Sequence, residues 1–429
     1  MTPLSSRPRC WQRLAAPILF VVTFVLALMQ LLRWVRHGEF FNPESPMLYS
    51  AATMSFNYIE FGAIRRGLFG TLVFLLHPNR MVGTALFYVL SAATFCALAC
   101  WIFSRIRARP LSLLLFAALL VALVRRWGDD AGRSDLAILA ILSGAALLAV
   151  HRRPALAAAL MAGGVLAHET SVIYGVPLLV ALLLDQRRYA ELDRRQWLHV
   201  AIGAGLPLLV YVVLDLLPHA DIATMVHTVR DALSEHKYVN WAIYFAVSGK
   251  RGVETALCQN RTDPNYLQHL LAALLIVLLF TFALAGRSRR LEGLALLASL
   301  PPLLVLSVVA NDFTRWVEFA AYNAWLVCAL GDGSPSGTDA SRDRSLIGVR
   351  IAAALATVCL VTDFSRFPIR ERFYAPSPII EHIMVERLHE PVTPNLDVVW
   401  GRCDPDWLSF LNGLSQRRRD VQPTERPPS

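Results

Sequence analysis

The chain has 429 residues, of which 55% are hydrophobic and only 17% are charged, and its formal net charge is +9. A soluble protein of this length could not cover so much apolar surface, and the long apolar runs lack the two-residue alternation of a transmembrane barrel. Basic cytoplasmic loops account for the positive charge, and we find no basic soluble domain of the kind that binds nucleic acid. We therefore expect an all-α fold, a polytopic transmembrane helical bundle.

The first part of the chain predicts a membrane anchor and a long outer segment. The apolar run Ala15–Trp34 follows three arginines and is expected to be a retained signal anchor that runs from the cytoplasm outward. Residues 35–80 then form an outer segment, in which Gly67–Leu76 is too short to span and is expected to be an interfacial helix. Arginines at the inner ends then orient three spans, over Met81–Phe103, Leu111–Val124 and Leu136–Val150.

The next apolar stretch is interrupted by the residues HETS, which predicts two short helices that meet at His168–Glu169 near the outer face. Further spans bring the total to about eleven by hydropathy and charge; they are expected over Trp197–Leu217, Tyr266–Ala285, Leu291–Ala310, Trp316–Leu330 and Ile347–Val361. The membrane domain then covers residues 1–361, with a second outer loop over 218–265 and an extracytoplasmic tail over 362–429. The expected location is a bacterial inner membrane, with the N-terminus in the cytoplasm.

Charged residues at the outer face are exceptions to the usual distribution and therefore indicate a function. An arginine fork suits phosphate oxygens, whereas a carboxylate can act as a general base or hold a divalent cation. The candidates lie in four separate segments: Glu60, Arg65 and Arg66; Arg133 and Asp135; His168 and Glu169; Asp312 and Arg315. Together they predict a site for an acidic, lipid-linked substrate at headgroup height, with the metal requirement left open.

Each candidate also has a structural interpretation. Arg65 and Arg66 could be snorkelling residues at a helix start, and Asp135 could cap the apolar run that follows it. Asp312 and Arg315 could form an ordinary ion pair in a loop. A structural role is less favourable for His168 and Glu169, because either residue is costly inside an apolar run unless it is paired or hydrated.

Two of the seven cysteines, Cys258 and Cys403, fall in segments that are expected to lie outside the membrane. Thiols can be oxidised there, so we expect a disulfide between these two residues that ties the second outer loop to the tail. The other five cysteines have no metal-ligand spacing.

Four segments in order, YIEFGAIRRGLFG, GRSDLAILAIL, LAHETSVIYGVPLL and NDFTRW, resemble bacterial polytopic proteins related to the GT-C glycosyltransferases. The resemblance is one of architecture and motif order, and it covers roughly Phe41 to Trp325. It implies a polyprenyl-phosphate sugar as donor and an essential acid in the first outer loop. Glu60 or Glu44 matches that acid.

The resulting hypothesis is an inner-membrane glycosyltransferase that moves a sugar from a polyprenyl-phosphate donor to a glycan or lipid acceptor on the outer face. Glu60 is expected to be the base, while Arg65, Arg66 and Arg133 hold phosphate. His168 and Glu169 position the donor or the acceptor, and Asp135, Asp312 and Arg315 line the binding site. A polysaccharide polymerase and a transporter or flippase of lipid-linked saccharide remain alternatives, although transporters place ionisable groups near the midplane and often contain repeats.

Overall fold

The structure is a computed structural model in which every regular element is an α-helix within the described ranges. These ranges are residues 47–62, 64, 66–77, 79–105, 110–129, 134–185, 194–217, 221–233, 239–240, 242–244, 249–262, 266–286, 288–309, 313–331 and 346–362, with individual positions between 18 and 32 and between 403 and 413. Of the expected first span only these individual positions are described, and they are helical; most of the expected tail lies outside the described residues.

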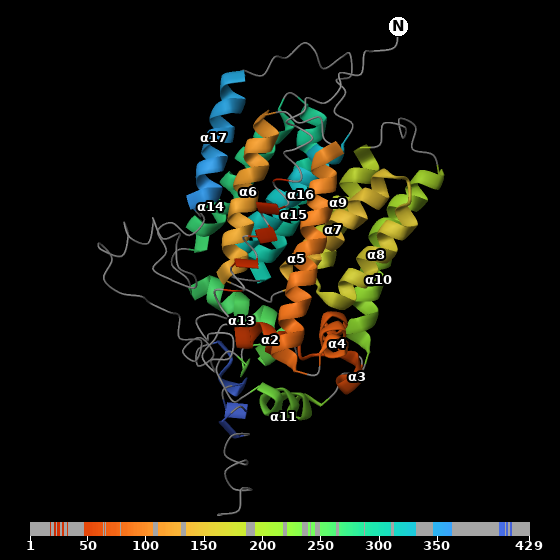
Figure 1. Cartoon of the computed structure of the whole chain (residues 1–429), viewed down its shortest axis with the longest axis vertical. Coiled ribbons are helices and arrows are strands. Elements are labelled where there is room, and N and C mark those ends of the chain that lie inside the picture. Colours follow the sequence, from red (N-terminus) through yellow and green to blue (C-terminus); the bar gives the residue numbers. More distant parts are fainter. Residues whose placement is uncertain are drawn as a thin grey trace, which may run out of the picture.

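Ten helices form an elongated bundle (Figure 1). They are α5 (Arg80–Arg105), α6 (Pro110–Asp129), α7 (Asp135–Val150), α8 (Pro154–Ala167), α9 (Thr170–Asp185), α10 (Arg194–Leu216), α14 (Tyr266–Ala285), α15 (Arg289–Val309), α16 (Phe313–Leu330) and α17 (Leu346–Thr362). Five further helices of the described ranges lie toward one end of the bundle, at the bottom of Figure 1: α2 (Met47–Thr53), α3 (Tyr58–Phe61), α4 (Gly67–Leu76), α11 (Ile222–Leu233) and α13 (Gly249–Thr262). We call this the capped end.

The central helix of the bundle is α16. It packs against α9, α14 and α15, contacts α5, α6 and α7 as well, and is buried at every residue from Arg315 to Val327. The Trp325 ring stacks on Phe116 of α6 with 4.1 Å between the ring centroids. A helix that is apolar around its whole circumference can be stable only when neighbours or lipid cover all its faces. Apart from a few buried polar residues, among them Arg315, Glu318 and Asn323, α16 is apolar on all its faces, which is consistent with its central place.

Two polar side chains of α16 form hydrogen bonds to neighbouring helices. The Ser143 and Tyr322 hydroxyl oxygens lie 2.7 Å apart and link α7 to α16. The Asn323 amide donates to the carbonyl oxygens of Tyr174 in α9 and Ala298 in α15, at 2.8 Å and 2.9 Å. Buried polar groups need such partners, because an unmade hydrogen bond in an apolar medium costs more than a made one contributes. These contacts fix how α16 is rotated against its neighbours.

The outer surface of the bundle is apolar, as expected for a protein in a membrane. Three described helical segments are long and apolar enough to cross one, Arg80–Phe103, Tyr266–Ala285 and Arg289–Val308, and further apolar helices contain 10–17 residues. Large aliphatic side chains project outward at helical spacing from α10, α14 and α17, among them Leu209, Val212, Leu267, Leu271, Leu275, Ile347, Ile351, Leu355 and Val358. Soluble monomers rarely expose so much continuous apolar surface.

The second outer loop is more structured than the sequence indicates, since it carries α11 and α13. A disulfide joins Cys258 of α13 to Cys403, with 5.8 Å between the Cα atoms and 145 residues between them in the chain. Next to it, the Tyr244 hydroxyl donates to the Asp404 carboxylate at 3.1 Å, and Trp407 lies edge-on to the Tyr244 ring. The described part of the tail is thus fixed on the second outer loop by a covalent bond and by aromatic packing.

The short helix α4 fits into the capped end through two glycines. A Cβ atom added to Gly70 would lie 1.7 Å from the carbonyl oxygen of Phe56, and one added to Gly67 would lie 2.4 Å from the Tyr58 ring. The backbone of α4 therefore rests directly on the segment that leads into α3. Its bounds, Gly67–Leu76, are those expected from the sequence.

We predict that Gly70→Ala destabilises the protein by about 1–3 kcal/mol, because the methyl group would force backbone away from backbone. Gly163→Ala in α8 is the matched control, since nothing lies within 4 Å of a Cβ atom added there. Thermal unfolding of the purified variants in one detergent measures both effects. Equal unfolding temperatures for Gly70→Ala and the wild type would contradict the close packing of α4.

Candidate functional site

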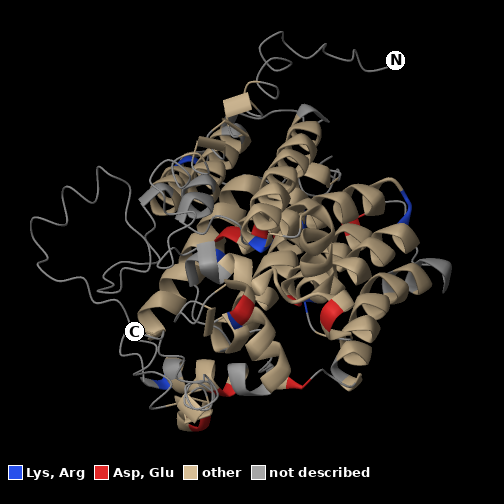
Figure 2. Cartoon of the chain, turned by 60° about the horizontal axis from the view of Figure 1, so that its bottom comes forward, with Lys and Arg blue, Asp and Glu red and all other residues tan. Residues whose placement is uncertain are grey.

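Acidic and basic residues come together at the capped end, and Figure 2 shows this end turned forward. Three ion pairs join segments that are far apart in the chain: Arg66 with Glu169, Arg80 with Glu60, and Arg315 with Asp135. Helices α5, α7, α9 and α16 all begin at this end because successive helices of the bundle alternate in direction (Figure 1). The expectation that the outer candidates share one face agrees with this arrangement, whereas their pairing could not be read from the sequence.

Arg66 and Glu169 form a bidentate pair between the start of α4 and the turn before α9. The Arg66 Nε atom donates to Glu169 Oε2 at 2.9 Å, and a terminal guanidinium nitrogen donates to Oε1. The two side chains are 17% and 26% exposed, so solvent reaches the pair. Burial raises the pKa of Glu169, but the adjacent charge of Arg66 outweighs burial and holds that pKa well below its usual value. Glu169 is therefore an ionised carboxylate.

The backbone at Arg66 is in the left-handed region, with φ 60° and ψ 18°. A residue with a Cβ atom adopts this conformation at a cost of about 1–2 kcal/mol. Such outliers persist only where surrounding contacts determine them, and they are common at functional sites. The strained turn directs the Arg66 side chain to Glu169 at the point where α4 begins.

Glu169 lies in the break between α8 and α9, as the sequence predicts for His168–Glu169. His168 is only 7% exposed, and its Nδ1 atom accepts a hydrogen bond of 3.1 Å from the backbone N–H of Thr170. The imidazole thus caps the first turn of α9, and its Nδ1 atom lies 3.6 Å from Glu169 Oε2.

Tyr58 brings the first outer segment to this break. Its hydroxyl donates to the carbonyl oxygen of Leu166 at 3.1 Å, and its backbone N–H donates to the Thr71 hydroxyl at 2.9 Å. Burial raises the pKa of Tyr58 to about 12, so the phenol stays protonated and remains a donor. Because Gly67 leaves space for the Tyr58 ring, α4 can lie close enough to place Arg66 against Glu169.

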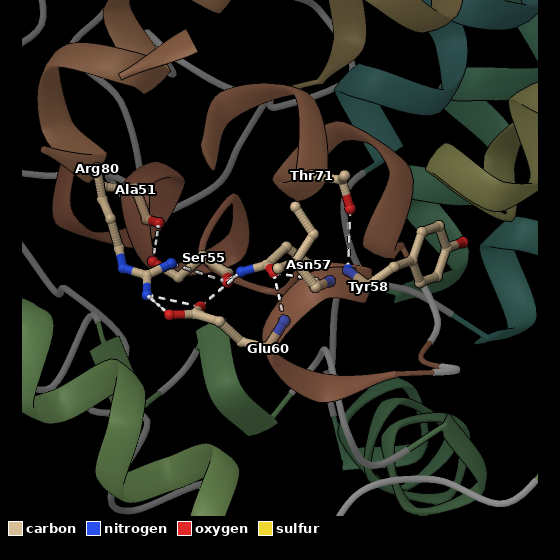
Figure 3. A network of polar contacts seen from close by, with 8 residues as sticks. Ala51, Ser55, Asn57, Tyr58, Glu60, Thr71 and Arg80 are labelled. Atoms are coloured by element: carbon tan, nitrogen blue, oxygen red, sulfur yellow. Dashed lines mark hydrogen bonds and ion pairs between the residues drawn. The ribbon is translucent and has the colours of Figure 1, made fainter. Parts of the chain in front are cut away.

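Glu60 lies in a separate polar network, which Figure 3 shows. Both of its carboxylate oxygens accept hydrogen bonds from Arg80, at 2.9 Å and 2.7 Å, and the Asn57 amide donates to the second oxygen at 2.6 Å. Arg80 also donates to the carbonyl oxygen of Ser55 at 3.1 Å. The Tyr58 ring points away from this network (Figure 3). The partner of Glu60 is thus Arg80, which sequence reasoning did not single out although it is an arginine in the first outer segment.

Asp135 and Arg315 pair inside the bundle. The two side chains are only 7% and 10% exposed, and the Arg315 guanidinium also lies over the Trp316 ring, 5.0 Å from its centroid. Both residues were expected to line the binding site. Each charge neutralises the other between the first turns of α7 and α16. Such a buried pair can hold the two helices together without any ligand. The structural interpretation is therefore stronger here than at Arg66 and Glu169.

Three predicted site residues, Arg65, Arg133 and Asp312, lie outside the described residues. Within the described part of the chain, no group of three or more His, Cys, Asp or Glu side chains could hold a metal ion. The chain matches no family model, no curated protein and no solved structure in comparisons with each. Functional inference therefore depends on the site itself.

The Asp135–Arg315 pair leads to a prediction about stability. Arg315→Met leaves a buried carboxylate without its partner, which should cost about 3–5 kcal/mol of unfolding free energy. The double variant Asp135→Asn with Arg315→Met removes both charges and should recover much of that loss. Thermal unfolding of both single variants and the double variant gives the coupling. Additive effects would show that the two residues do not stabilise each other.

Proposed function

We propose that the protein is an inner-membrane glycosyltransferase, which transfers a sugar from a polyprenyl-phosphate-linked donor to a glycan or lipid acceptor at the extracytoplasmic face. The observation that carries the proposal is the partly exposed Arg66–Glu169 pair at a helix break, at the end of an apolar bundle. An arginine fork that binds a carboxylate in bidentate fashion has the geometry to bind phosphate oxygens.

The surroundings of Arg66 suit a phosphate that carries a lipid chain. Helix α4 begins at Gly67, so its free backbone N–H groups and the positive end of its dipole lie beside the arginine. The same helix exposes Leu72, Leu75 and Leu76, of which Leu75 is 67% exposed. A polyprenyl chain could pack along these leucines while its phosphate binds Arg66.

The proposed reaction is a displacement at the anomeric carbon of the donor sugar. The acceptor hydroxyl oxygen forms a bond to that carbon, the bond from the carbon to the phosphate oxygen breaks, and the lipid phosphate leaves. A carboxylate accepts the hydroxyl proton. Glu169 contacts Arg66 directly and therefore lies near a phosphate bound there, so we assign it as the base. Glu60, held by Arg80 and Asn57, is the alternative base.

Two conservative variants separate these assignments. We expect Glu169→Gln to lower turnover by at least about 100-fold, the usual contribution of a general base, and Glu60→Gln to lower it by less than about tenfold. Sugar transfer from a polyprenyl-phosphate donor by purified protein in nanodiscs is the measurement, with thermal unfolding as the control for folding. The reverse order of effects would move the base to Glu60. Full activity in both variants would reject carboxylate catalysis at this site.

The proposed topology has the N-terminus in the cytoplasm, about eleven spans, and the capped end outside. Two observations support it. The Cys258–Cys403 disulfide lies at the capped end, and disulfides persist in oxidising compartments. At the opposite end of the bundle lie Arg152, Arg153, Arg289 and Arg290, as expected for cytoplasmic connections.

Reporter fusions test this topology. A fusion after Arg290 should report the cytoplasm and a fusion after Ser429 the extracytoplasmic side, because α15, α16 and α17 lie between them. Each site is fused to two reporters, one that is active only in the cytoplasm and one that is active only outside. Either location then gives a positive signal. A cytoplasmic signal from Ser429 would contradict the outer placement of the tail.

A further inference from the structure

The Glu169 carboxylate occupies the positions on Arg66 that two oxygens of a phosphate would take. It accepts from one edge of the guanidinium group, through Nε and one terminal nitrogen. We propose that Glu169 is an intramolecular latch on an anion-binding site at Arg66, and that a lipid phosphate binds there by displacing the Glu169 carboxylate. Binding of the lipid phosphate does not depend on the proposed function. Only the sugar transfer that would follow binding rests on it.

The pair has the properties that such an exchange requires. Both side chains are partly exposed, at 17% and 26%, whereas those of Asp135 and Arg315 are at most 10% exposed. Arg66 supplies both side-chain hydrogen bonds that the structure gives to Glu169. A phosphate can therefore reach the fork, and it replaces one charged bidentate contact by another of the same geometry.

Glu60 provides a contrast within the same outer segment. The Arg80 and Glu60 side chains are 11% and 28% exposed, similar to Arg66 and Glu169, but the Glu60 carboxylate accepts from the Asn57 amide as well as from Arg80. Displacing Glu60 would break this network and would leave the amide of Asn57, a buried residue, without its carboxylate acceptor. Exchange is therefore favoured at Arg66 and disfavoured at Arg80, although both sites are arginine–carboxylate pairs.

The displacing anion is a lipid phosphate because of the surface beside the arginine. Leu72, Leu75 and Leu76 are exposed along α4, the helix that begins next to Arg66. A free phosphate would use the arginine alone, whereas a prenyl phosphate would also cover these leucines. Once displaced, Glu169 no longer accepts from Arg66 and can take a proton from an acceptor hydroxyl. The base then becomes available only when the donor is bound.

Binding of farnesyl phosphate to the full-length protein in nanodiscs tests the latch, with farnesol and inorganic phosphate as separate probes. Removing the competing carboxylate in Glu169→Gln should tighten farnesyl phosphate binding by at least about threefold. In that variant the phosphate no longer has to displace a charged side chain from Arg66. Arg66→Ala should weaken it by about tenfold or more, the equivalent of one charged hydrogen-bonded contact. Farnesol affinity should be the same in all variants.

Asp221→Asn is the matched control. It removes one negative charge from the exposed cap of α11 at the same end and touches no arginine in the described contacts, so farnesyl phosphate affinity should be unchanged. Equal tightening by Asp221→Asn and Glu169→Gln would reduce the effect to net charge and overturn the latch. Unchanged or weaker binding in Glu169→Gln would overturn it as well, and inorganic phosphate binding as tightly as farnesyl phosphate would overturn the lipid as ligand.

The latch and the proposed function fail in different ways. Tighter farnesyl phosphate binding by Glu169→Gln, combined with no sugar transfer by the wild type, would retain the latch and reject the glycosyltransferase. Sugar transfer by the wild type, combined with equal affinities in the wild type and Glu169→Gln, would reject the latch and retain the enzyme.

Discussion

Interrupting a helix inside an apolar sequence leaves backbone N–H and C=O groups without helical partners, and this constraint organises the capped end. Between α8 and α9 these groups are satisfied locally and by the first outer segment. The His168 ring accepts from the N–H of Thr170, and the carbonyl oxygen of Leu166 accepts from the Tyr58 hydroxyl. The second contact links residues 108 positions apart. Satisfying the break therefore also positions α4, and with α4 the Arg66 side chain.

Burial gives two similar ion pairs different roles. Asp135 and Arg315 lie among the helices of the bundle, where the desolvation of both charges makes the loss of either partner expensive. Arg66 and Glu169 keep contact with solvent, where an ion pair contributes little to stability and a competing anion can enter. The degree of burial thus separates a packing contact from a candidate binding site, although the chemical groups are the same.

Local sequence signals predicted the features that depend on neighbouring residues. The apolar runs, the HETS interruption and the short GLFGTLVFLL segment correspond to helices with nearly the expected bounds, because helix formation and breaking are decided within a few residues. The pairing of Cys258 with Cys403 followed from membrane sidedness, since only these two cysteines were expected outside. Alternation of the spans likewise predicted one shared end for the charged candidates, and those that the structure describes lie there.

The partners of those charges depend on tertiary packing and could not be predicted. Arg66 and Glu169 are 103 residues apart, and Asp135 and Arg315 are 180 apart. Glu60 was expected in the same site as Arg65 and Arg66. The chain instead turns at Gly62, with φ 67°, and again at Arg66, with φ 60°. Two left-handed residues within five positions redirect the segment, so Glu60 meets Arg80 and Arg66 meets Glu169.

The two ends of this redirected segment are held by different contacts. For that reason the Arg66–Glu169 contact can be exchanged while the backbone around it stays in place. Asn57 caps α3 and binds Glu60, while Arg80 holds Glu60 to the start of α5. At the other end, Gly67 and Gly70 pack α4 against Tyr58 and Phe56 without involving the Arg66–Glu169 contact. Displacing Glu169 therefore removes one ion pair but leaves the glycine packing and the Tyr58 hydrogen bond, so Arg66 keeps its position while its partner changes.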